Sequence, residues 1–153
     1  MIIRPAGNED AAGVAGVLHD LVLAGMRSKR HDPEFAHQHY IAHPSRIECH
    51  VAESDDGRIL GFQSIKLAKS GNEYGAPVGW ALIGTHISPQ AARRGIGKAL
   101  FAFTLKAARK AGVPAIEAFI GEKNAVGQAY YDAMGFVEYR RTDGAICKSF
   151  DLS

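Results

Sequence analysis

Apolar residues recur along the chain at the spacings expected of short strands and amphipathic helices. A strand at residues 2–4 leads to a helix that starts near Glu9, with Asn8 as its expected cap. The apolar stripe of this helix consists of Ala12, Val14, Val17, Leu18, Leu21 and Val22. A second, shorter helix is predicted to start at Pro33 and to end before Pro44. The first third of the chain therefore predicts one strand followed by two helices.

In the middle of the chain, apolar and polar residues alternate as they do in strands. Residues 47–53 place Ile47, Cys49 and Val51 opposite Glu48 and His50, which predicts a half-buried strand. Asp55-Asp56-Gly57 predicts a hairpin turn, and residues 59–67 form the returning strand. A further strand is expected within residues 78–87.

From Gly95 onward the apolar period changes to that of a helix. Its predicted buried face consists of Ile96, Leu100, Phe103, Thr104 and Ala107, and Gly112 is its expected carboxyl-terminal cap. The remaining elements are a strand at 115–120, a helix at 124–134 that Gly135 ends, and closing strands at 136–139 and 145–150. This order predicts a mixed α/β fold around one central sheet, in a single domain that spans residues 1–153.

Composition narrows the class of protein. The chain has 153 residues, of which 46% are hydrophobic, and its formal net charge is +2, so a nucleic acid is not an expected partner. Cys49 and Cys147 lack the spacing of a zinc site or a disulfide framework, which favours a reducing cytoplasm. His19 and Asp20 interrupt the apolar stretch 14–26, so no membrane span is expected, and the first residues do not have the pattern of a leader peptide.

The segment 87–98, with the sequence Ile-Ser-Pro-Gln-Ala-Ala-Arg-Arg-Gly-Ile-Gly-Lys, joins a strand to a helix through two glycines. A helix start with free amides and flanking cations favours an anion, and a diphosphate is the expected ligand. Neither common nucleotide loop fits, since Lys98 is not followed by Ser or Thr and Leu100 replaces the third glycine of the dinucleotide fingerprint. An ordinary turn with a solvated basic face is the alternative.

This loop resembles the [Q/R]xxGx[G/A] motif of the GNAT superfamily of acetyl-CoA-dependent N-acetyltransferases, and Ile87-Ser88-Pro89 resembles its V-x-P lead-in. A second family element is matched by Asn124, by the pair Tyr130-Tyr131 and by Gly135-Phe136. The resemblance implies an α/β GNAT-like domain, with a mixed sheet of about seven strands and about four helices, splayed between strands four and five.

The resemblance also implies transfer of an acetyl group from acetyl-CoA to a primary amine of a small molecule or a protein, by direct attack in a ternary complex. It places the cofactor on Ile87, Ala92, Arg93, Arg94, Gly95, Gly97, Lys98, Asn124 and Tyr131. Tyr131 would donate a proton to the departing thiolate, with a core aromatic as the alternative role, and Tyr130 would be the core residue of the pair. A homodimer is a further, weaker implication.

Two positions depart from the family pattern. Ala92 stands where the motif has Gln or Arg, and Ala81 stands where some members carry a Glu that acts as general base. Glu117 is therefore the candidate base. The alternatives are that Glu117 is an ordinary outward strand residue, or that the amine loses its proton to solvent. Strand alternation turns His86 to the sheet face opposite Ile87. A catalytically weak acetyl-CoA-binding regulatory module is the alternative function.

The loop after the first helix and the second helix are rich in histidine and in charge. No ligand set for a metal ion accompanies their histidines, so we expect no metal, and we interpret them as either solvated or in contact with the acceptor, whose site this region often borders in the family that the chain resembles. The candidate contacts are Asp32, Glu34, His31, His37, His39 and His43. Residues 27–30 are expected to form a solvated basic loop.

Overall fold

The computed structural model describes residues 1–153 and contains one sheet of seven strands in the order β1-β2-β3-β4-β5-β7-β6. The strands are β1 (Ile2–Pro5), β2 (Arg46–Glu53), β3 (Ile59–Leu67), β4 (Ala81–Ile87), β5 (Ala115–Gly121), β6 (Val137–Thr142) and β7 (Ala145–Asp151). The helices are α1 (Ala11–Leu23), α2 (Pro33–Ala36), α3 (Ile96–Ala111) and α4 (Ala125–Met134). Short 3₁₀ turns lie at Asn8–Asp10 and Pro89–Ala91, and a π-helical turn lies at His37–Ile41. Neighbouring strands are antiparallel except β4 and β5, which run parallel.

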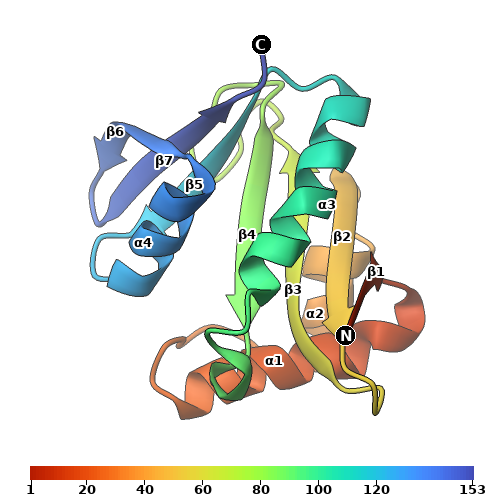
Figure 1. Ribbon diagram of the computed structural model, residues 1–153. Coiled ribbons are helices and arrows are strands. Elements are labelled where there is room, and N and C mark those ends of the chain that lie inside the picture. The colour runs from red at the N-terminus through yellow and green to blue at the C-terminus, as the bar shows by residue number, and fades with distance from the viewer.

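Helices cover both faces of the sheet (Figure 1). On one face α1 and α2 bury Val14, Leu18 and Ala36 against Val51 and Phe62 of β2 and β3. On the other face α3 and α4 bury a second group against β3, β4 and β5. This second group includes Leu100, Phe101, Tyr131, Ile65, Ala81 and Ile116. The predicted mixed α/β architecture, with seven strands and four helices, is confirmed.

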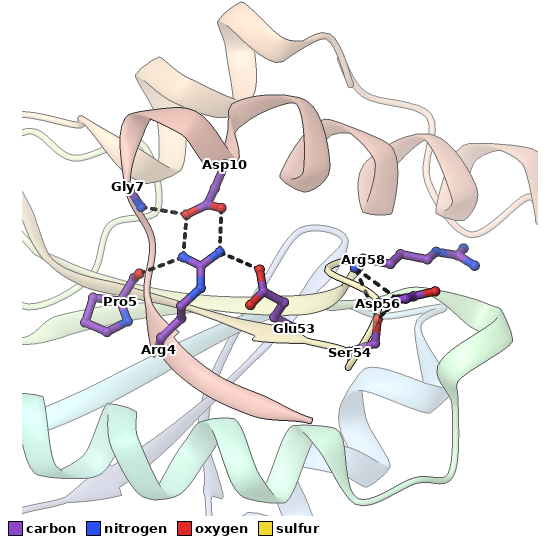
Figure 2. A network of polar contacts seen from close by, with 8 residues as sticks. All are labelled: Arg4, Pro5, Gly7, Asp10, Glu53, Ser54, Asp56 and Arg58. Carbon is purple, nitrogen blue, oxygen red and sulfur yellow. Dashed lines mark hydrogen bonds and ion pairs between the residues drawn. The ribbon is translucent and has the colours of Figure 1, made fainter.

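Arg4 connects β1 to the turn that precedes α1 through side-chain hydrogen bonds (Figure 2). Its guanidinium donates to both carboxylate oxygens of Asp10 at 2.8 Å and to Glu53 Oε2 at 2.9 Å. Asp10 also accepts from the Gly7 amide at 2.7 Å, so it caps the turn that precedes α1. The predicted cap, Asn8, was wrong: its side chain pairs with His37 Nε2 at 2.9 Å instead.

Because both sheet faces are covered, some positions predicted to be exposed are buried. His50, expected on the solvent face of β2, is buried beneath α3, with its ring 5.5 Å from that of Phe103. Two positions predicted to be buried are instead exposed. Phe103 is 43% exposed, and Phe101 fills the place in the core that was predicted for Phe103, by packing on Phe136 and Phe150. In α1, Ala12 is exposed rather than buried.

The two parallel strands separate after a short stretch of pairing. Only Ala81–Ile83 of β4 pairs with Ile116–Ala118 of β5, whereas β4 continues to Ile87 along β3 and β5 continues along β7. Figure 1 shows the two strands diverging toward the start of α3. Residues 82–87 are all partly exposed although β4 lies in the middle of the sheet. The predicted splay between strands four and five is therefore confirmed, and it leaves one edge of β4 without a partner strand.

Candidate functional site

The loop between β4 and α3 presents a row of free backbone amides. Gly95 has a φ of 72° immediately before α3, and Arg93 has a φ of 64°. The amides from Arg93 to Lys98 donate to no acceptor within the protein, whereas the Ala99 amide bonds to Gly95 O at 3.0 Å. The Ala92 amide is already used, since it donates to Pro89 O at 3.2 Å. This loop and helix start can therefore hold an anion through main-chain donors.

Positive side chains surround these amides. Arg93, Arg94 and Lys98 are exposed, and none of them makes an ion pair with a carboxylate. Arg94 makes one weak contact, from Nη2 to Gln90 O at 3.4 Å. Their charge is thus available to an anionic ligand at the start of α3.

The neighbouring tyrosines of α4 have different partners. Tyr130 donates its hydroxyl to Gly97 O at 2.8 Å and accepts from Gln63 Nε2 at 2.9 Å. A Cβ at position 97 would lie 2.5 Å from the Tyr130 ring, so a glycine is required there. Tyr130 therefore joins α4 to the start of α3, which agrees with its predicted core role.

Tyr131 places its hydroxyl against the unpaired part of β4. The residue is 7% exposed, and its phenol oxygen lies 2.8 Å from Thr85 Oγ1. Burial raises the pKa of the Tyr131 phenol, so the group keeps its proton through the neutral range. Tyr131 thus combines a ring packed in the core with a protonated hydroxyl at the splay.

Asn124 lies at the start of α4, and Ile87 lies at the end of β4. The Asn124 side chain caps α4 by accepting from the Gly127 amide at 2.9 Å. Ile87 ends β4, pairs with Gly61 of β3 and has no partner on its other edge. Sequence reasoning missed Thr85 and Gln63, because nothing in their local pattern marks a hydroxyl or an amide that faces α4 across the sheet.

Glu117 is fully buried on β5, opposite Leu82, within the last paired stretch before the splay. Its Oε1 accepts from Arg140 Nη2 at 2.6 Å, from Arg140 Nε at 3.0 Å and from the Tyr139 hydroxyl. Its Oε2 is buried and has no hydrogen-bond partner. Arg140 also donates to Tyr74 O at 3.0 Å and so ties the β3–β4 loop to this pair. Sequence reasoning named Glu117 as a candidate base but did not predict Arg140 as its partner, and the alternative of an ordinary outward strand residue was wrong, because the side chain is fully buried.

Ala81, where some relatives carry a base, is fully buried in the core that faces α3. His86 lies on the opposite face, as predicted: its ring stacks on Phe62 at 4.8 Å, and Phe62 belongs to the core under α1. The His86 Nδ1 is buried without a partner. Position 81 therefore offers no side chain that could accept a proton.

The candidate acceptor contacts Asp32, Glu34 and His31 lie at the start of α2 and just before it. Asp32 caps α2 by accepting from the Phe35 amide at 3.1 Å, and Glu34 accepts from Gln38 at 3.3 Å. The ring of His31 lies 5.1 Å from that of His19. These side chains therefore have local partners.

His39 lies deeper, stacked on Phe35 at 4.8 Å and edge-on to Tyr40 at 4.6 Å. The expectation of a solvated loop at residues 27–30 was wrong for Arg27, whose Nε is buried. No group of His, Cys, Asp or Glu residues gathers closely enough to hold a metal ion.

A hollow of about 480 Å³ lies between α1 and residues 30–33 and is lined by His31 and Asp32 but by none of the motif residues. None of the helices has the length and apolar character that a membrane span requires. The site described above consists of the splay and the free amides.

The sequence matches the family model described as the acetyltransferase (GNAT) family over residues 16–136. No curated protein matches it. Several solved structures share its fold. A GCN5-related N-acetyltransferase from Kribbella flavida has 21% identity and a TM-score of 0.78, over 99% of this chain and 97% of that one.

Two further similar structures contain a form of coenzyme A. PaiA N-acetyltransferase from Thermoplasma acidophilum, in complex with coenzyme A, has 17% identity and a TM-score of 0.77, over 99% of this chain and 98% of that one. The yncA protein of Salmonella typhimurium, with its cofactor acetyl-CoA, has 19% identity and a TM-score of 0.72, over 99% of this chain and 94% of that one. At these identities the likeness establishes the fold.

Proposed function

This chain belongs to the acetyltransferase (GNAT) family, and on that premise we propose that it transfers an acetyl group from acetyl-CoA to a primary amine by direct attack in a ternary complex. The observation that carries the proposal is the splay of β4 from β5, with the Tyr131 hydroxyl at its side. An open strand edge, a protonated phenol and a row of free amides are together what a thioester substrate with a diphosphate needs.

The residues present fit acetyl-CoA. The free amides from Arg93 to Lys98, which include those of Gly95 and Gly97, would bind the diphosphate, with charge added by the side chains of Arg93, Arg94 and Lys98. Ala92 borders this loop with a methyl group only.

The unpaired edge of β4, from Gly84 to Ile87, offers N–H and C=O groups to the amides of the pantetheine arm. Asn124 would contact that arm from the start of α4. Both contacts use groups that the splay leaves accessible.

Acetyl-CoA supplies an activated carbonyl carbon and a thiolate leaving group. The amine nitrogen forms a bond to that carbon, the C–S bond breaks, and Tyr131 gives its proton to the sulfur. Because burial raises the pKa of the Tyr131 phenol, the hydroxyl is protonated when the thiolate leaves. Thr85 orients the hydroxyl through its 2.8 Å contact.

The proton that the amine loses needs an acceptor. We propose Glu117, through Oε2, because this oxygen is buried without a partner while Oε1 is held by Arg140 and Tyr139. Its position opposite Leu82, next to the splay, supports this assignment. Loss of the proton to solvent before binding is the competing route.

The test is release of free thiol from acetyl-CoA in the presence of a panel of amines, measured with a thiol-reactive chromogenic reagent. We expect turnover with at least one amine. Tight binding of acetyl-CoA without turnover of any amine would instead indicate a regulatory binding module, which the alanine at position 81 favours. We also propose a cytoplasmic location, because Cys49 and Cys147 are both free and buried. A homodimer is proposed on the resemblance to the family alone.

A further inference from the structure

A group of basic side chains lies on the α1 and α2 face of the sheet, next to the unpaired part of β4. We call Arg27, His39, Lys66 and His86 the cationic cluster: His39, Lys66 and His86 lie around the Tyr40 ring, and Arg27 lies over the neighbouring Phe35 ring. The rings of Tyr40 and His86 are 5.4 Å apart, and Lys66 Nζ lies 5.4 Å from the centre of the Tyr40 ring. The cluster collects residues from the loop after α1, from the π-helical turn and from β3 and β4.

Neither the arginine nor the lysine of this cluster has a carboxylate partner. Arg27 donates from Nη2 to Arg30 O at 2.9 Å and lies 5.8 Å from the centre of the Phe35 ring, but its Nε is buried without an acceptor. Lys66 is half-buried and forms no ion pair. Buried donors without acceptors cost free energy, so this arrangement favours a ligand that supplies acceptors.

Burial is the main cause of the pKa shifts in this cluster, and nearby cations add to it only for the histidines. Burial lowers the pKa of Lys66 to about 8 and that of His39 to about 4. Burial, reinforced by the charges of Arg27 and Lys66, lowers the pKa of His86 to about 3. The exposed carboxylate of Glu73 opposes these shifts for His39 and Lys66 but does not cancel them. The histidines are therefore neutral at pH 7, and the net charge comes from the arginine and the lysine.

The cluster is in reach of the reacting end of the proposed site. His86 belongs to the part of β4 that has lost its β5 partner. Two residues earlier, Gly84 has no side chain, and a Cβ there would be in ordinary contact with its neighbours, 3.6 Å from His86 Cε1 and 3.5 Å from Ser64 Oγ. A small molecule held by the cluster can thus place an amine beside the open edge of β4.

We propose that the acetyl acceptor is an amine that also carries a carboxylate, and that Arg27 and Lys66 bind this carboxylate beside Tyr40 and His86. The inference rests on the proposed acetyltransferase function and names the acceptor class for it. A carboxylate provides the acceptors that the buried guanidinium nitrogen lacks and neutralises the field of two cations. The same field disfavours polyamines and other acceptors with several positive charges.

The experiment compares matched acceptors that differ only in the anionic group. We would measure kcat and KM for γ-aminobutyrate against its amide, for L-leucine against L-leucinamide, and for spermidine, with saturating acetyl-CoA. The γ-amino pair matters because its carboxylate is too far from the amine to change the amine pKa much. We expect kcat/KM to favour the carboxylate by about 10-fold or more, the range of a charge-assisted hydrogen bond.

Two variants test the assignment of the residues. Arg27→Gln and Lys66→Gln should each raise KM for the carboxylate acceptor about 10-fold and leave KM for acetyl-CoA unchanged. Lys69→Gln, an exposed lysine in the nearby loop, is the control and should change neither. Melting temperatures verify that each variant is folded. The two variants test the arginine and the lysine separately.

Turnover of the amides or of spermidine as efficiently as of the carboxylates would overturn the proposal and leave the acetyltransferase function intact. If no amine is turned over, calorimetry of the same pairs with CoA-loaded protein decides. Preferential binding of the carboxylates that Arg27→Gln abolishes would support the cluster as an anion site, and equal binding would overturn it.

Discussion

The phenol oxygen of Tyr131, on α4, lies 2.8 Å from the hydroxyl oxygen of Thr85, on β4. Thr85 has no β5 partner, since the pairing of the two strands ends at Ile83 and Ala118. The Gln63 side chain donates to the same Thr85 oxygen at 2.9 Å and fixes its position from β3. The contact thus brings a buried proton donor to the one part of the central sheet where the backbone of β4 is open on one edge.

Tyr131→Phe keeps the ring in the core and removes only the donor. We expect kcat to fall by about 10²–10⁴, the usual value of general acid catalysis, with little change in acetyl-CoA affinity. Steady-state kinetics with a working amine and calorimetry with acetyl-CoA measure the two effects. Tyr130→Phe is the control, since that hydroxyl bonds to Gly97 O and should affect stability more than kcat. Wild-type turnover in Tyr131→Phe would leave Tyr131 with a packing role only.

Gly95 is required for its backbone conformation. Its φ of 72° is strained for a β-branched residue, although nothing lies within 4 Å of a Cβ there. Gly95→Val should therefore move the following amides and weaken acetyl-CoA binding at least about 10-fold, the loss of one or two hydrogen bonds to a charged group. Gly95→Asn tolerates this φ and should bind much more like the wild type. Equal affinity of the folded Val variant and the wild type would show that the diphosphate binds elsewhere.

The basic residues at the start of α3 should act through charge. Replacing Arg93, Arg94 and Lys98 by Gln should raise the Kd for acetyl-CoA, and the difference from wild type should shrink as salt is added. A matched control replaces the exposed cations Lys106, Arg109 and Lys110 near the other end of the same helix, with the same change in net charge. Calorimetry at low and high salt measures both. The assignment fails if the two triple variants bind acetyl-CoA alike.

Arg140 neutralises a carboxylate that is wholly inaccessible to solvent. Arg140→Met should lower the free energy of unfolding by about 3 kcal/mol, because it leaves the Glu117 charge buried without its partner. Arg141→Met, which breaks an exposed pair with Glu138, should cost no more than about 0.5 kcal/mol. Combining Arg140→Met with Glu117→Gln should recover much of the loss. Denaturant unfolding measures all three, and equal effects of the two single variants would contradict the prediction.

Stability should fall as the pH is lowered below neutrality. The pKa values of His86 and His39 are lowered from 6.5 to about 3 and about 4, so the unfolded chain binds protons first as the pH falls below 6.5. The free energy of unfolding should decrease between pH 6.5 and about 4, by at most about 1.4 kcal/mol per pH unit for each histidine.

His86→Gln should flatten this dependence, whereas His19→Gln, on the exposed side of α1, should not. The carboxylate of Asp10 contributes only at lower pH, because its pKa is lowered from 3.8 by Arg4. Denaturant unfolding at several pH values gives the slope. An unchanged slope in His86→Gln would mean that the imidazole is hydrated in the folded protein.

Local pattern was sufficient for most elements of the fold. The hairpin turn at residues 55–57 and the helical period after Gly95 predicted β3 and α3 with nearly their observed bounds. Periodicity was less reliable for which residues face the core, as Phe101 and Phe103 show. A helix buries whichever stripe its neighbours leave room for, and the aromatic partners Phe136 and Phe150 come from segments distant in sequence.

The sequence by itself determined the family, the turn that contains the glycine loop and the helix that carries Tyr131, because each depends on residues close together in the chain whose spacing reflects one local structure. Only the tertiary structure decided that Tyr131 meets Thr85, that Arg140 holds Glu117, and that the Nε of Arg27 is buried rather than solvated. These contacts join side chains from separate elements. Their existence depends on how the sheet splays and which face each helix covers, and these depend on packing of the whole chain rather than on any local pattern.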